Sequence, residues 1–228
     1  GVPVYNASHL FGFFSVFNSS ALNNVEIIKG GFPARFGGRV SSVLDIRMKE
    51  GNMKKLSGEA SIGLISSKLT LEAPIIKDKT SFIISGRRTY IDILAQPFIK
   101  RSANQNRSNS KDGNGVNNAG YFFYDLNAKI NHKFSDKSRL YLSTYMGNDK
   151  AYSSIRDSYS QDTINFVENS ENNLEWGNIT TALRYNQIIS NKLFANFTAT
   201  YSRYRFNIGF LSSSEASTTS ATVNNSIG

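Results

Sequence analysis

The sequence lacks cysteine altogether and contains only two histidines among its 228 residues. The absence of cysteine excludes disulfide bonds, thiolate metal sites and cysteine nucleophiles within this chain. His9 and His132 lie far apart in the sequence, and a single imidazole without partners does not form a metal site. We therefore expect each histidine to be a surface or packing residue, and we assign no metal-ligating residue.

Long hydrophobic runs are also missing. No stretch approaches the ~20 apolar residues of a transmembrane helix, and the most apolar run, residues 10–17, is too short. The first four residues have neither the basic nor the apolar region of a signal peptide, so we expect the chain to be part of a longer protein. The low mean hydropathy does not exclude a membrane protein, because a transmembrane barrel strand is half polar.

Catalytic and cofactor-binding patterns are absent as well. The sequence contains no paired carboxylates, no Ser/His/Asp set and no phosphate-binding loop. We therefore expect the protein not to be an enzyme, and we assign no catalytic residue, cofactor-binding residue or cofactor.

Positive charge is in excess, since 26 Lys and Arg residues outnumber 17 Asp and Glu residues, which gives a net charge of +9. Such an excess can indicate binding to nucleic acid or to an anionic membrane surface. However, the basic residues are scattered through expected turns and loops, and tight clusters such as Arg87-Arg88 are only pairs. We therefore do not expect nucleic acid to be a partner.

A repeating pattern of strands and turns begins at about residue 52. Tight polar turns recur at residues 77–80, 135–138 and 190–192, at nearly equal spacing. β-branched and aromatic residues flank each turn, as they do in β-hairpins. The pattern predicts about six antiparallel strands between residues 56 and 210, each of ~12 residues or more and so longer than the usual strand.

Polar segments separate these hairpins. Stretches rich in Asn, Ser, Gly and Asp cover residues 96–120 and 150–172, and another begins near residue 212. Because this composition does not suit a packed core, we expect three long loops.

Polar and apolar residues alternate most clearly in residues 124–134 and 193–202. The alternation slips near Leu64-Ile65, inside an expected strand at residues 58–73. A period of two with one wholly polar face predicts a strand whose two faces meet different surroundings. In the first strand the polar face comprises Asp125, Asn127, Lys129, Asn131 and Lys133, opposite Leu126, Ala128 and Ile130.

Long antiparallel strands with short turns at one end and long loops at the other are typical of outer-membrane β-barrels. Six strands are too few to close such a barrel, whose smallest members have eight. An open strand edge in lipid would leave backbone groups unpaired, so we expect the remaining strands to lie outside this sequence or in another chain. A soluble β-sandwich or adhesin-like domain is the alternative, although long strands and regular loops disfavour it.

The most specific motif occupies residues 25–51, VEIIKGGFPARFGGRVSSVLDIRMKEG. It predicts short strands at residues 25–29 and 40–49, with glycine pairs forcing a compact loop between them. Upstream, Asn18 or Ser19 is suited to cap a single helical turn.

This ordered motif resembles the last part of the plug domain of TonB-dependent outer-membrane receptors. The opening residues, Gly1 to Val4, look like the preceding plug strand of that family. The Gly30-Gly31-Phe32-Pro33 variant departs from the commoner form and suggests a divergent or SusC-like branch, which weakens any transfer of substrate. The residues that carry the resemblance are Glu26, Lys29, Gly30, Gly31, Arg35, Gly37 and Gly38.

The resemblance implies a mainly β fold in two parts. Residues 1–51 would be the C-terminal part of a small α/β plug domain, and residues 52–228 the first strands of a transmembrane antiparallel β-barrel with long extracellular loops. Arg35, Arg39 and Arg47 are candidates for plug–barrel contacts with lumen carboxylates, or they are solvated surface residues.

The implied function is active uptake across the bacterial outer membrane. The nutrient would be scarce or bulky, such as a glycan, a peptide or a metal chelate, and no substrate can be read from the sequence. The implied partners are outer-membrane lipids and the TonB energy-transducing complex, which would engage a segment upstream of Gly1. A surface lipoprotein is left open as a further partner. The rival interpretation is a non-transport outer-membrane or adhesive β-protein.

Overall fold

The computed structural model divides the described chain into two compact units. The first comprises residues 1–89, 123–149 and 176–205, and the second comprises residues 90–122, 150–175 and 206–228. The residues that the structure describes are 2–5, 8–9, 12–31, 33, 36, 41–109, 115–161 and 163–218. The chain is mainly β, and its strands form antiparallel sheets, as the sequence predicts.

Two small antiparallel hairpins occupy the first 50 residues. β1 (Ser8–His9) pairs with β2 (Phe14–Ser15), and β3 (Leu22–Lys29) pairs with β4 (Ser42–Met48). The predicted strands at residues 25–29 and 40–49 are therefore present, the second described from Ser42 onward.

A single helical turn connects the two hairpins. It is the 3-10 helix η2 (Ser19–Ala21), and the Asn18 side chain accepts a hydrogen bond of 3.2 Å from the Ser20 backbone N–H. A short amide side chain satisfies an N–H that has no partner inside the turn. The predicted cap is thus confirmed, with Asn18 as the capping residue.

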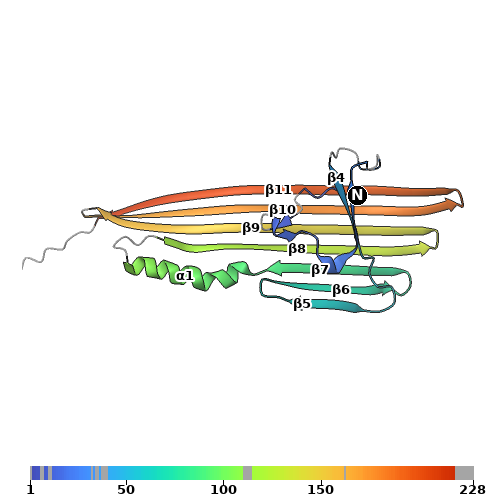
Figure 1. The fold of residues 1–228 in the computed structure, drawn as a ribbon, viewed down its shortest axis with the longest axis horizontal. Helices are drawn as coiled ribbons and strands as arrows, with labels where there is room; N and C mark the ends of the chain where they lie inside the picture. The colour runs from blue at the N-terminus through green and yellow to red at the C-terminus, as the bar shows by residue number, and fades with distance from the viewer. Residues whose placement is uncertain are drawn as a thin grey trace, which may run out of the picture. The chain divides into compact units, whose positions relative to one another are not determined.

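The main sheet contains seven strands in sequence order (Figure 1), from β5 at one edge to β11 at the other. The predicted turns at residues 77–80, 135–138 and 190–192 each connect two neighbouring strands. The strands are β5 (Ser57–Ile62), β6 (Ser66–Ile76), β7 (Thr80–Thr89), β8 (Gly115–Ser135), β9 (Ser138–Gln161), β10 (Ile164–Ser190) and β11 (Leu193–Thr218).

The prediction of about six strands is wrong by one, because the expected strand at residues 58–73 is a hairpin. β5 ends at Ile62 and β6 begins at Ser66, and the Gly63 N–H donates to the Ser66 carbonyl at 2.9 Å across the turn. The slipped alternation near Leu64-Ile65 was the sign of this turn. In this hairpin odd positions pair with even ones, as in Ile62 opposite Ser67, so one continuous period of two cannot pass through the turn.

The long-loop predictions are also wrong for the described residues. Residues 150–172 belong mostly to β9 and β10, and β11 continues past residue 212 to Thr218. Most of residues 96–120 lie in helix α1 (Ile91–Asn109) and in β8. Paired strands satisfy each other's backbone groups regardless of side-chain polarity, so a polar composition did not prevent these hairpins from extending. No helix in the described part of the chain is long and apolar enough to cross a membrane.

Burial on the sheet is inverted relative to that of a water-soluble domain. In the first unit the buried positions of the sheet are largely polar, whereas large apolar side chains on the same strands are exposed. Buried polar residues include Ser81, Ser85, Asp125, Asn127, Asn131, Asp149 and Asn178, and exposed apolar residues include Leu69, Ile84, Ile130, Phe134, Leu142, Leu183 and Phe197. Soluble domains bury most of their large apolar side chains. The exposed apolar face of this sheet is therefore suited to contact with apolar surroundings.

Gly51 joins the N-terminal hairpins to the main sheet at a point where no side chain fits. Its φ is +83°, and a Cβ there would lie 2.5 Å from the backbone oxygen of Phe82. Glycine alone tolerates this combination of left-handed backbone and close approach. The chain can therefore enter β5 close against β7 without strain.

Replacing Gly51 with alanine should lower the free energy of unfolding by about 1–3 kcal/mol, because it adds both backbone strain and a clash. Urea unfolding measures the change. Gly86→Ala is the matched control, since a Cβ there meets its nearest atom, in Leu126, at 3.8 Å and the backbone is not left-handed. Equal losses at both positions would contradict the role given to Gly51.

Candidate functional site

The candidate site is the polar interface between the N-terminal segment, meaning the described residues from 8 to 50, and the main sheet within the first unit. His9 lies at its centre and is 1% exposed. Its Nδ1 is 2.5 Å from the Asp149 carboxylate, and its Nε2 is 3.6 Å from the Asp125 carboxylate. One imidazole thus bridges β9 and β8.

Arg87 ties the same carboxylate back to the segment. Its Nε donates to Oδ2 of Asp125 at 2.7 Å, and one terminal nitrogen forms an ion pair with the same oxygen at 2.6 Å. The same terminal nitrogen donates to the Ser15 backbone carbonyl at 2.6 Å. A guanidinium can serve two acceptors at once because its donors are fixed in one plane. Arg87 therefore connects β7, β8 and β2.

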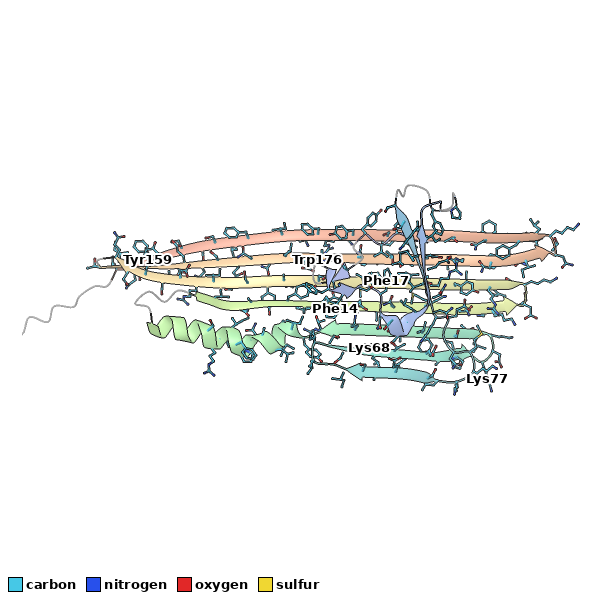
Figure 2. All side chains as sticks on the ribbon, viewed as in Figure 1. Phe14, Phe17, Lys68, Lys77, Tyr159 and Trp176 are labelled. Carbon is cyan, nitrogen blue, oxygen red and sulfur yellow. The ribbon has the colours of Figure 1, made fainter. Side chains whose placement is uncertain are left out.

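The Phe123 ring packs against these charged groups. Its ring is fully buried and stacks on His9, with centroids 4.0 Å apart and planes 6° from parallel. The Arg87 guanidinium carbon lies 5.0 Å from the ring centroid, which suits a cation–π contact. From the segment, Phe14 packs against Phe123 and Phe17 against Tyr145. Phe14 and Phe17 are labelled in Figure 2.

The cluster sets two carboxylates, Asp125 and Asp149, against the His9 imidazole and the Arg87 guanidinium. Burial lowers the pKa of the His9 imidazole, but hydrogen bonds to Asp125 and Asp149, together with their charges, outweigh it. The net effect is a raised pKa for His9. An isolated buried ion would be costly, so each member depends on the others.

A second group of contacts surrounds Glu50, at the end of the segment. Its carboxylate accepts a hydrogen bond of 3.3 Å from the Asn131 side chain and lies 4.0 Å from Lys129 and 3.8 Å from Arg139. Lys129 also donates to the Met48 backbone carbonyl at 3.3 Å. The predicted polar face of residues 124–134 therefore meets the segment at Lys129 and Asn131.

A third group involves η2 and the strands β5 to β7. The Asn18 amide donates to Ser85 at 2.7 Å, and Lys68 donates to Ser20 at 2.8 Å while pairing with Glu59 at 3.2 Å. Lys68 is labelled in Figure 2. Each of these bonds exchanges a contact with water for one with protein, so the net gain per bond is small. Such an interface can hold the segment and also release it.

The predicted motif residues lie elsewhere, on and after β3. Glu26 stands opposite Asp45 and Lys29 opposite Ser42 in the β3–β4 pair, and both side chains are exposed. Gly30 and Gly31 adopt φ of +63° and +52°, the left-handed conformation that a glycine turn provides. Arg35, Gly37, Gly38 and Arg39 lie outside the described residues.

Arg47 is 57% exposed, and its guanidinium hydrogen-bonds to Asp45 two residues earlier at 3.2 Å. This partner lies within β4. In the described part of the interface the arginine and lysine contacts come from the sheet, through Arg87 and Lys129, and their acceptors include carbonyls of the segment. Arg35 and Arg39 lie outside the described residues, so their plug–barrel contacts stay predictions.

Sequence reasoning missed His9, Arg87 and Asp149 as interface residues. His9 was expected to be an isolated packing or surface residue, yet its partner Asp149 is 140 residues away. The available signals were weak: the Arg87-Arg88 pair, and Asp125 on a wholly polar strand face. Among the described residues, no three His, Asp or Glu side chains are arranged to hold a metal ion.

The chain matches no family profile, no curated protein and no solved structure. The interface itself consists of ion pairs, hydrogen bonds and ring contacts between two parts of one chain.

The His9 cluster should make attachment of the N-terminal segment dependent on pH. Because the pKa of His9 is raised in the folded state, its contribution is fully present below the unfolded value of about 6.5 and is lost as pH rises through the folded value. Urea unfolding at a series of pH values above and below 6.5 measures this loss.

His9→Gln keeps a polar side chain but cannot titrate, so it should remove this pH dependence. His132→Gln is the control, because it removes the other imidazole of the chain, which hydrogen-bonds to Thr80. If the pH dependence survived in His9→Gln and disappeared in His132→Gln, it would come from His132, and the role given to His9 would be wrong.

Proposed function

We propose that this chain is part of a TonB-dependent receptor of the bacterial outer membrane, with a plug segment followed by the first strands of a transmembrane β-barrel. The observation that carries the proposal is the inverted sheet. Its polar face is partly covered by the N-terminal segment, and its other face exposes large apolar side chains such as Ile84, Ile130 and Phe197. A lipid-facing wall around a polar lumen needs this distribution.

The open edges of the sheet fit the same proposal. β5 and β11 end the strand order, and in lipid their outer backbone groups need partners. Further strands would supply these partners and close the barrel. A plugged lumen in such families is formed by about 22 strands.

The polar interface supports a role in which the segment moves. Apolar contacts between segment and wall would leave apolar surface on a wet lumen after release, whereas hydrogen bonds can be exchanged for bonds to water at about 0.5–1.5 kcal/mol each. The Asn18 contact is of this exchangeable kind, whereas those of Glu50 and His9 involve charged groups and are worth more, about 1.5–3 kcal/mol each. A plug that an energy-transducing complex pulls aside requires such a seal.

The proposed activity is energised uptake of a nutrient that is too bulky or too scarce for passive pores. The chain carries no feature that selects among a glycan, a peptide and a metal chelate. A non-transport outer-membrane or adhesive protein remains the competing function, and it would give the segment no reason to be releasable.

The lipid-facing side can be tested on β11, where both faces are exposed. Successive residues point to opposite faces, so Ala199 and its neighbour Thr198 sample the two environments at nearly the same depth. In the full-length protein, Ala199→Arg should cost up to about 2–4 kcal/mol of folding free energy in vesicles. Thr198→Arg should cost much less, because its side chain faces a wet lumen. Equal costs would exclude a lipid-facing apolar side.

The function can be tested by nutrient uptake in intact cells that carry the full-length protein. Uptake should stop when the proton gradient across the inner membrane is collapsed, because the plug then stays seated. The control is a variant lacking residues 8–50, which should let small polar solutes pass without energy. Uptake that continues unchanged without the gradient would indicate a passive pore, and no uptake under any condition would favour the adhesive alternative.

A further inference from the structure

Helix α1, in the second unit, has a polarity opposite to that of a helix on a water-soluble protein. Its outer stripe, defined as Ile93, Leu94, Pro97 and Phe98, is exposed, and Phe98 is 77% accessible. Ile93 and Pro97 are four residues apart, as are Leu94 and Phe98, so these positions lie toward one side of the helix. A solvated helix would carry polar residues there.

The opposite face of α1 is polar and is bonded to the protein. Gln96 donates to the Asn118 side chain at 2.6 Å and to the Ala119 carbonyl at 3.1 Å, both on β8. Asp92 is buried at 8% exposure. These hydrogen bonds hold the polar face of α1 against β8, so the outer stripe points away from the protein.

Two cations follow the outer stripe directly. Lys100 and Arg101 are both exposed, and Arg101 lies about 5 Å further along the helix axis than Phe98. The only acidic residue of the helix is the buried Asp92, so no carboxylate of α1 offsets the pair. An apolar stripe next to unopposed cations is the composition of helices that bind an anionic membrane surface.

We infer that α1 binds the interfacial layer of a lipid bilayer, with the outer stripe among the upper acyl chains and Lys100 and Arg101 on anionic headgroups. The inference rests on the proposed function, since it requires the strands to span that bilayer. Charge complementarity selects the occupant: a protein partner would need carboxylates set against Lys100 and Arg101, whereas a headgroup layer presents phosphates along its whole surface. A single residue, Tyr90, separates the end of β7 from the start of α1 in the sequence.

The absence of cysteine allows a direct measurement of depth. In the full-length protein, with any cysteine outside these residues replaced, single cysteines at Phe98→Cys and Phe197→Cys would carry a nitroxide label. Relaxation by oxygen, which concentrates in the bilayer, is compared with relaxation by a water-soluble nickel chelate. In vesicles containing phosphatidylglycerol, both labels should favour oxygen, the strand label more strongly.

Charge reversal then tests the basic pair. Lys100→Glu with Arg101→Glu should shift the label at residue 98 toward the nickel chelate in phosphatidylglycerol vesicles. The matched control is Lys54→Glu with Lys55→Glu, which changes the net charge equally at two exposed lysines near β5 and should leave the label unmoved. Pure phosphatidylcholine vesicles should give a shallower label at residue 98 than anionic vesicles do.

The outcomes separate the two proposals. An aqueous label at residue 98 beside a lipid-exposed label at residue 197 would overturn the role of α1 and leave the barrel intact. Aqueous labels at both positions would overturn the proposed function itself. Equal depth at residue 98 in anionic and zwitterionic vesicles, or an equal response to both charge reversals, would overturn the part given to Lys100 and Arg101.

Discussion

Asp125 holds a negative charge where only 2% of the residue is accessible, and the arrangement of the first unit follows from compensating it. A buried carboxylate is stable only when cations and donors surround it. Arg87 supplies two donors from the adjacent strand, and His9 supplies an imidazole from the N-terminal segment. The sheet alone therefore does not supply every partner of Asp125. His9 supplies one from the N-terminal segment, and this contact helps to hold the segment against the sheet.

The same constraint extends along the covered face of the sheet. Asn131 donates a hydrogen bond to Glu50, and Lys129 donates one to the Met48 carbonyl. Ser85 accepts one from Asn18. Both members of each of these contacts are polar. Each contact therefore adds only a modest net stability. The exposed face, in contrast, carries the large apolar residues. One set of strands thus carries polar contacts on one face and apolar side chains on the other.

Local chemistry explains what could be predicted from the sequence. The turns around Asp78, Asp136 and Asn191 and the cap at Asn18 depend on residues within a few positions, so their identity was sufficient. The alternation in residues 124–134 likewise predicted a polar and an apolar face. The polar stretch at residues 150–172 misled, because pairing of two strands satisfies backbone groups that composition alone would assign to loops.

The sequence by itself determined the β character, the hairpin turns and the two-faced strands, since each is encoded over a few consecutive residues. Only the tertiary structure decided which polar residues meet: His9 and Asp149 are 140 positions apart, and no spacing rule connects them. It also decided that Arg87 and Lys129 of the sheet donate to backbone carbonyls of the segment, at Ser15 and Met48. The physical reason is that a buried charge selects partners by distance in space, whereas a periodic pattern specifies only the direction in which a side chain points.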